Sequence, residues 1–130
     1  VLSFELEYDK IKSIKKQIPS GIIGYGYLPL MRTRICPVSV FRGCNSSRQC
    51  FIKDRYGIEF KVICSSKKDI AILNSVPLFI GDKCIMNINF EMLYFTVENA
   101  AQTDDVINQY INKEKPNFKL TRGLYFRGVK

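Results

Sequence analysis

Hydrophobic and polar positions alternate with two different periods along this chain. The first six residues mix apolar and polar side chains as a short strand does. Apolar residues then recur at steps of three and four, as on one face of a helix, at Tyr8, Ile11, Ile14 and Ile18. The following residues 22–31 are apolar on both faces, which predicts a strand covered on both sides. We therefore expect residues 1–31 to form a parallel strand–helix–strand unit with a right-handed crossover.

Residues 32–68 have a different character, because polar, turn-forming residues interrupt the apolar ones. Two alternating runs flank residues 54–57, which predicts a β-hairpin with Gly57 at a positive φ. In this hairpin we expect Asp54 to have a structural role in the turn rather than a catalytic one.

The C-terminal residues 69–130 return to longer apolar segments. We expect a short segment at 70–78, a buried strand at 88–97 and then a helix whose N-cap is Thr103. The apolar stripe of that helix is Val106, Ile107, Tyr110 and Ile111. The whole chain, residues 1–130, is thus expected to be a single domain of mixed α/β or α+β class.

Length and composition describe one domain or a piece of a larger one. The 130 residues suffice to bury a hydrophobic core, and no apolar run approaches the roughly 20 residues of a membrane span. The chain opens on Val1 within a strand-like segment, so we expect a fragment. No histidine occurs in the sequence, which excludes Ser-His-Asp and Cys-His catalysis and histidine metal ligands. With no signal-peptide pattern, we expect a cytoplasmic protein that does not insert in membranes.

The net charge of +8 is concentrated in residues 32–68, where nine Lys or Arg residues accompany two acidic ones. Such an excess attracts a polyanion, an anionic substrate or a negatively charged metal cluster. We expect four of these basic residues to orient an anionic substrate: Arg32, Arg34, Lys53 and Arg55.

Four of the five cysteines lie in this basic region, at Cys36, Cys44, Cys50 and Cys64. Thiolates gathered after a strand form a soft ligand set suited to an iron–sulfur cluster or zinc. A zinc ribbon is disfavoured, because no Cys-x-x-Cys pair occurs. The spacing leaves open that these residues bind no metal and are small buried apolar side chains. That second interpretation suits Cys84, which lies in an apolar stretch and which we expect in the core.

Several segments resemble motifs of the collagenase-like peptidase family U32, in the same order along the chain. They are residues 25–31 with 34–37, residues 51–60, residues 73–78, residues 93–98, and residues 121–123 with 127–129. The second segment is similar to the family pattern L-K-D-R-x-G-x-x-F-P-V, and the third to Y-N-S-x-P-L. Two positions depart from the family. Lys61 stands where the hairpin motif has proline, and Leu124 where the last motif has histidine.

The resemblance implies the C-terminal portion of a protein built on a TIM-type (β/α) barrel. Residues 1–31 are then a late barrel unit, residues 32–68 a cysteine-bearing hairpin insertion, and residues 69–130 a further strand–helix region with a basic tail. It also implies that the four cysteines of the basic region hold an iron–sulfur cluster, as in relatives. The rest of the parent barrel is an expected partner, and so is a second copy of the chain, because exposed sheet edges favour pairing.

The family is associated with peptidase activity on collagen and with oxygen-independent hydroxylation of RNA or of a quinone precursor. The resemblance therefore implies an enzyme, a hydrolase or an iron–sulfur-dependent modifying protein, of which this chain carries an incomplete active site with no assigned catalytic residue. The basic region suits RNA better than collagen. The alternative is a non-catalytic basic accessory module that binds RNA or another subunit.

Overall fold

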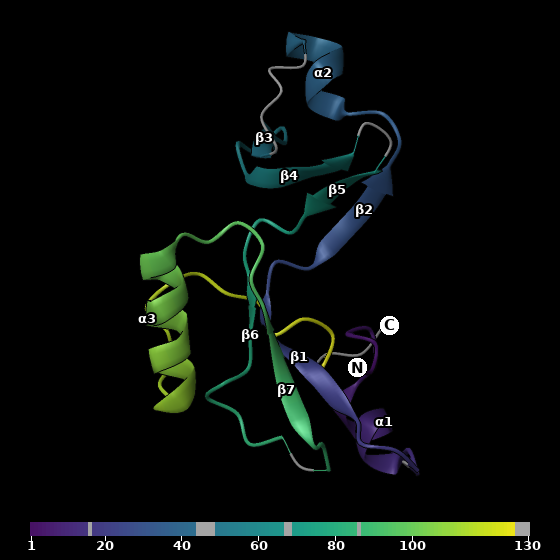
Figure 1. Cartoon of the computed structure of the whole chain (residues 1–130), viewed down its shortest axis with the longest axis vertical. Coiled ribbons are helices and arrows are strands. Elements are labelled where there is room, and N and C mark those ends of the chain that lie inside the picture. Colours follow the sequence, from purple (N-terminus) through teal and green to yellow (C-terminus); the bar gives the residue numbers. More distant parts are fainter. Residues whose placement is uncertain (16, 44–48, 67–68, 86, 127–130) are drawn as a thin grey trace. The chain divides into compact units, whose positions relative to one another are not determined.

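Two β-sheets and three α-helices form in the computed structural model, which describes residues 1–15, 17–43, 49–66, 69–85 and 87–126 (Figure 1). The fold is of mixed α+β class, and neither sheet closes into a barrel within these residues. The chain divides into two compact units. Unit 1 consists of Val1–Gly26 and Val76–Lys130, and unit 2 consists of Tyr27–Ser75.

Unit 1 contains a three-stranded sheet with the order β6–β1–β7. The central strand β1 (Gly21–Gly26) runs parallel to β7 (Phe90–Tyr94) and antiparallel to the two-residue strand β6 (Leu78–Phe79). Two helices belong to the same unit, α1 (Tyr8–Ser13) and α3 (Ala100–Ile111). Helix α3 follows β7 directly in the chain, so a parallel strand pair is succeeded by a helix.

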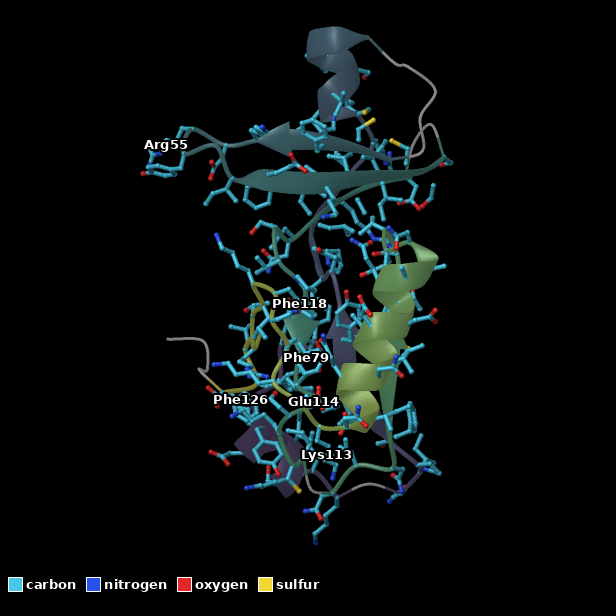
Figure 2. The ribbon with its side chains drawn as sticks, turned by 90° about the vertical axis from the view of Figure 1, so that its left-hand side faces the viewer. Arg55, Phe79, Lys113, Glu114, Phe118 and Phe126 are labelled. Carbon is cyan, nitrogen blue, oxygen red and sulfur yellow. The ribbon has the colours of Figure 1, made fainter. Side chains whose placement is uncertain are left out.

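One hydrophobic cluster of unit 1 is largely aromatic. Its buried members are the side chains of Tyr25, Phe79 and Val106. Phe79 contacts Phe118 edge to face, with ring centroids 6.0 Å apart, an arrangement that aromatic rings prefer (Figure 2). Because Val106 lies on α3, Tyr25 on β1 and Phe118 in the segment after the helix, this cluster joins α3 and the following segment to the sheet.

Unit 2 contains a four-stranded antiparallel sheet with the order β2–β5–β4–β3. Its strands and helix have these bounds: β2 (Pro29–Thr33), α2 (Pro37–Arg42), β3 (Gln49–Lys53), β4 (Glu59–Ser66) and β5 (Asp69–Leu73). The buried side chains of Val62, Ile70 and Ile72 form a separate cluster, called here the unit 2 core.

The expected strand over residues 1–6 does not form, so the predicted strand–helix–strand unit is wrong. Residues 4–6 form a turn, in which the Leu6 N–H donates to the Ser3 carbonyl at 3.2 Å. The Ser3 hydroxyl also accepts from the Glu5 N–H at 3.2 Å. Such local serine bonds compete with the ladder of a strand. The alternating pattern therefore reflects half-buried Leu2, Phe4 and Leu6 in an irregular segment.

The expected continuous strand over residues 22–31 is divided between the two sheets. Strand β1 ends at Gly26, whose φ of 147° strongly favours glycine. A Cβ at this position would also lie 2.5 Å from the Tyr94 carbonyl oxygen. The chain changes sheet after this glycine, and β2 begins at Pro29.

The C-terminal helix begins earlier than Thr103. Its N-cap is Asn99, whose side chain accepts from the Gln102 N–H at 2.9 Å, and the Gln102 side chain accepts from the Asn99 N–H at 3.0 Å. This reciprocal pair is a capping box built from amides instead of the usual serine and glutamate. The strand expected at 88–97 is shorter, at Phe90–Tyr94.

The predicted hairpin is confirmed. Strands β3 and β4 pair antiparallel from Gln49↔Ile63 to Lys53↔Glu59, and Gly57 in the connecting turn has a φ of 77°. No helix in the described ranges has both the length and the apolar character that crossing a bilayer would require.

Candidate functional site

Three cysteines from three separate segments meet at the unit 2 core. Cys36 is the N-cap of α2, Cys50 lies on β3 and Cys64 lies on β4. All three are partly buried and pack against the unit 2 core. The structure thus brings together three of the four cysteines that the sequence nominated as ligands.

The strand register explains why two of these thiols share one face of the sheet. Cys50 lies opposite Val62, and Cys64 lies opposite Ile70. Residues directly opposite in neighbouring strands point to the same face, as do residues two apart in one strand. Both thiols therefore share the face of the buried Val62, and Cys36 and Val38 pack against the same core. Figure 2 shows sulfur atoms, drawn in yellow, between α2 and this sheet.

The environment of Cys36 favours its thiolate. Desolvation by partial burial would by itself raise the pKa of this thiol, but the net effect of its surroundings is to lower the pKa below 9.0. The opposing causes are the backbone N–H groups of Ser39 and Val38, followed by the side chains of Cys64 and Ser39. Proline at the first helical position has no N–H to offer, so the two next residues supply the donors. A thiolate is the form of cysteine that ligates metals and attacks electrophiles.

The fourth predicted ligand, Cys44, lies outside the described residues. Within the described ranges, no three side chains of His, Cys, Asp or Glu are grouped as a metal site. The donor chemistry of Cys36, Cys50 and Cys64 nevertheless fits a thiophilic metal, because all three donors are sulfur and all are partly buried. The three described thiols alone do not form a closed ligand set.

Cys84 is not a core residue, contrary to the prediction. Its side chain is exposed. The chain turns after Ile80, where the Lys83 N–H donates to the Ile80 carbonyl at 2.8 Å. Strand β6 has ended before this turn, so the apolar stretch no longer has the regular geometry that would carry Cys84 into the core.

The four predicted substrate-binding residues lie at two places in unit 2. Arg32 is on β2 and is exposed, with its guanidinium 3.2 Å from the Asp69 carboxylate, and exposed Arg34 follows the same strand. Lys53 ends β3 and Arg55 lies in the hairpin turn, at the tip labelled in Figure 2. Because β2 and β3 are the two edge strands of the sheet, the structure pairs these residues two by two rather than in one site.

The hairpin presents cations next to aromatic rings, a feature that the sequence prediction missed. The Arg55 guanidinium lies 4.6 Å from the Tyr56 ring centroid, and the Lys53 ammonium 5.8 Å from that of Phe51. All four side chains are exposed, Tyr56 at 72%. The sequence signal for this arrangement was a pair of basic residues, at 53 and 55, between aromatic residues at 51 and 56.

Asp54 holds the hairpin turn, as predicted. One carboxylate oxygen accepts from the Tyr56 N–H at 2.8 Å and from the Ile58 N–H at 2.9 Å. Its backbone carbonyl accepts from the Gly57 N–H at 3.0 Å. Since this carboxylate is engaged by the turn, its role is to fix the geometry of the hairpin tip.

In unit 1, the side chains of Glu91 and Tyr110 lie next to Gly24, an arrangement that the sequence analysis did not identify. An ideal Cβ at Gly24 would lie 3.2 Å from a Glu91 carboxylate oxygen and would overlap the Tyr110 hydroxyl. That hydroxyl is buried and has no hydrogen-bond partner within the described residues. Burial raises the pKa of Glu91, an effect that the charge of Lys113 partly opposes. A glycine in the central strand, at Gly24, was the available sequence signal.

Tyr125 is the second buried phenol near this group. Its hydroxyl donates to the Ile23 carbonyl at 3.2 Å. Desolvation by burial raises the pKa of Tyr125 to about 12, and the negative charge of Glu91 acts in the same direction. Tyr125 is therefore neutral at physiological pH and serves as a structural donor.

The carboxylate of Glu98 is fully engaged by hydrogen bonds in unit 1. One oxygen accepts from the Tyr25 hydroxyl at 2.9 Å, and the other accepts from the Thr96 and Val97 N–H groups at 2.7 and 2.9 Å. This arrangement anchors the segment after β7 to the buried Tyr25. The hydrogen bonds of both carboxylate oxygens give Glu98 a structural role in this segment.

Comparisons of this chain with protein-family models, with curated proteins and with solved structures give no match. The three cysteines that pack against the unit 2 core and the aromatic, basic hairpin are therefore interpreted from their own geometry.

Proposed function

We propose that this chain is part of a U32-type protein and that unit 2 holds a thiolate-ligated iron–sulfur cluster. The ligands in this proposal are Cys36, Cys44, Cys50 and Cys64. The observation that supports it is the convergence of Cys36, Cys50 and Cys64 on one hydrophobic core from three separate segments.

The surroundings of the thiols suit this role. Partial burial against apolar residues limits the access of water, and the lowered pKa of Cys36 favours the charged form that a metal requires. An iron–sulfur cluster would supply one-electron transfer at this position. Zinc is the alternative for the same four donors. Such a site requires reduced thiols, which agrees with the expected cytoplasmic location.

The topology of unit 1 supports a barrel origin. Strands β1 and β7 are parallel and α3 follows β7, as in a strand–helix unit of a (β/α) barrel. The chain leaves unit 1 at Gly26 and returns at Val76, which agrees with an insertion after a barrel strand. We infer that the parent protein is an enzyme of the peptidase U32 type, which modifies RNA or a small molecule by oxygen-independent hydroxylation.

Metal analysis of the anaerobically purified protein tests the cluster. We expect near-stoichiometric iron and acid-labile sulfide in the wild type, and loss of both in Cys36→Ser, Cys44→Ser, Cys50→Ser and Cys64→Ser. Cys84→Ser is the matched control and should retain both, because Cys84 is exposed in unit 1. Stoichiometric zinc without sulfide would identify the zinc alternative. Unchanged metal content in the Cys44→Ser and Cys64→Ser variants would contradict the ligand assignment.

A second function, RNA binding by a basic accessory module, is favoured by the charge and side chains of unit 2. Nine Lys or Arg residues and three acidic ones give residues 27–75 a net charge of +6. The exposed rings of Phe51 and Tyr56 can stack on bases, while Lys53 and Arg55 can contact phosphates. This function needs neither metal nor catalysis.

Fluorescence anisotropy with a single-stranded oligoribonucleotide tests the second function. We expect binding that weakens steeply from low to moderate salt, and a loss of roughly tenfold for Tyr56→Ala, since one stacked base contributes about 1–3 kcal/mol. Unit 1 offers a control in Tyr8→Ala, because the Lys12 ammonium lies 4.3 Å from the Tyr8 ring centroid, although this ring is half-buried and packs against Phe126. Equal losses for both variants, or no binding at low salt, would argue against this surface.

A further inference from the structure

We propose that single-stranded RNA binds along a track of three aromatic side chains in unit 2, which are Tyr56, Phe51 and Tyr27. Each ring stacks on one base, and the cation beside each ring contacts a phosphate. This inference rests on the RNA binding proposed above for the hairpin. It adds Tyr27 and Lys61 to that site and extends the site from the hairpin tip onto one face of the sheet.

Strand alternation places Phe51 on the face of the unit 2 sheet that points away from the unit 2 core, called here the open face. Its neighbours Cys50 and Ile52 both pack against that core, and successive residues of a strand point to opposite faces. Lys61 lies directly opposite Phe51 in the β3–β4 ladder and therefore shares its face. Helix α2 packs on the core side through Val38. Phe51 is thus a large ring, 49% exposed, on a face that α2 does not cover.

The side chain of Lys61 connects Phe51 to a third ring. Its ammonium lies 4.4 Å from the centroid of the Tyr27 ring and donates to the Tyr27 hydroxyl at 3.4 Å. Tyr27 is half-buried and belongs to unit 2. Lys61 makes no ion pair with any residue that the structure describes, so its charge is available to an anion.

Three cation–aromatic pairs therefore follow one another from the hairpin tip, which is labelled at Arg55 in Figure 2. In this order they are Arg55 with Tyr56, Lys53 with Phe51, and Lys61 with Tyr27. Single-stranded RNA is the complement of such a pattern, because every nucleotide carries a base that can stack and a phosphate that attracts a cation.

Binding exchanges the partner of each ring. In the free protein a cation lies beside the ring, as Lys61 does at Tyr27. An exposed cation–π contact contributes less than a stacked base, so a base can take the face of the ring. The displaced cation then contacts the neighbouring phosphate, and the condensed counterion of that phosphate is released.

Two carboxylates on the open face restrict the track to its hairpin half. Asp69 pairs with Arg32 at 3.2 Å, which neutralises that cation at the β2 edge. Glu59 lies opposite Lys53 and weakens the attraction of a phosphate there. The main phosphate contact on the sheet is therefore assigned to Lys61.

Fluorescence anisotropy with a short oligouridylate tests the two new residues. We expect Tyr27→Leu to weaken binding at low salt by roughly tenfold, the usual effect of losing one stacked base. Lys61→Gln should reduce the slope of log Kd against log salt by roughly 0.7, the value for one phosphate of a single strand. Lys12→Gln is the matched control and should leave the slope unchanged, because Lys12 lies 4.3 Å from the Tyr8 ring centroid in unit 1. Circular dichroism checks that each variant is folded.

Photo-crosslinking to an oligonucleotide that contains 5-iodouridine locates the bases independently of affinity. Cleavage with trypsin after Lys and Arg places the three rings on separate peptides, at residues 17–32, 49–53 and 56–61. We expect RNA adducts on all three peptides. The peptide of residues 1–10, which carries Tyr8, should have none.

The outcomes separate this track from the hairpin function on which it rests. If Tyr56→Ala weakens binding while Tyr27→Leu and Lys61→Gln bind as the wild type does, and adducts occur only on residues 56–61, the hairpin function stands and the track is overturned. Absence of binding at low salt overturns both. Equal competition by polyglutamate of the same charge also overturns the track, since that polymer has no bases to stack.

Discussion

Gly24 is a residue of unit 1 that leaves no room for a side chain. It lies on the central strand β1, and a Cβ at this position would overlap the Tyr110 hydroxyl and lie 2.8 Å from the ring carbon that bears it. The backbone of Gly24 needs no special φ, so the restriction is one of space alone. The ring of Tyr110 is held in turn by Phe79, with centroids 5.5 Å apart.

We expect Gly24→Ala to lower the free energy of unfolding by about 1–3 kcal/mol, the usual cost of overpacking a filled core. Urea unfolding followed by circular dichroism measures this loss. Tyr110→Phe is the companion variant, because it removes a buried hydroxyl that lacks a described partner and should itself cost little. The double variant should recover part of the loss. If adding Tyr110→Phe to Gly24→Ala restores no stability, the added Cβ collides with a group other than the Tyr110 hydroxyl.

Glu91 gives unit 1 a pH dependence of defined sign. Burial raises the pKa of Glu91 above 4.5, so the folded protein binds the carboxyl proton more tightly than the unfolded chain does. Its favourable contribution is fully present below the unfolded pKa and is lost as the pH rises through the folded pKa. We expect Glu91→Gln, which is uncharged throughout, to have a higher Tm than the wild type at pH 7, with the difference closing below pH ~4.5.

Thermal unfolding by circular dichroism at a series of pH values checks this expectation. Glu114→Gln is the matched control, since Glu114 is an exposed carboxylate that follows α3 in the same unit (Figure 2). A difference between Glu91→Gln and the wild type that does not depend on pH would show that the carboxylate is not the cause.

At the level of elements, local signals predicted the β3–β4 hairpin better than the helix ends. The hairpin depends on neighbours in sequence, because Asp54 supplies the turn bonds and Gly57 the positive φ. For helix α3 the sequence analysis favoured Thr103 as the N-cap, whereas the capping box places the N-cap at Asn99. Thr103 instead donates its hydroxyl proton to the Asn99 carbonyl at 3.0 Å, inside the first turn.

We expect Asn99→Ala to lower the free energy of unfolding by about 1 kcal/mol, the usual value for loss of an N-cap. Thr103→Ala, the control at the position favoured by the sequence, should cost clearly less. Denaturant unfolding of both variants measures the difference. A larger loss for Thr103→Ala would place the effective helix start at that residue.

At the scale of the whole molecule, each unit has a hydrophobic cluster of its own among the residues that the structure describes. Val62 is fully buried in unit 2, and Val106 is 4% exposed in unit 1. Each cluster draws its members from one unit only. Stability can therefore differ between the units, as it does between cooperative regions of many proteins.

Val62→Ala and Val106→Ala form a matched pair, because each removes the same two methyl groups from a buried site. We expect each to cost roughly 2 kcal/mol. Hydrogen exchange read by mass spectrometry should show protection lost mainly in residues 27–75 for Val62→Ala, and mainly in the remainder for Val106→Ala. Equal loss across the chain for both variants would mean that the two units unfold as one.

The sequence by itself determined the features that depend on near neighbours. These are the hairpin with its turn, the presence of a C-terminal helix, the basic character of residues 32–68 and the nomination of four cysteines. Each arises from spacing, turn chemistry or charge within a short stretch of chain.

Tertiary structure decided what depends on contacts between distant segments. One apolar run is divided between two sheets at Gly26, where the φ is positive and the Tyr94 carbonyl leaves no space for a side chain. The β3–β4 register places Cys50 and Cys64 on one face, and the packing of α2 adds Cys36. Burial beside Gly24 raises the pKa of Glu91, and the turn after β6 leaves the Cys84 side chain exposed. Apolar periodicity indicates which residues are suited to burial. The residues that they pack against depend on contacts between distant segments, which form only in the folded chain.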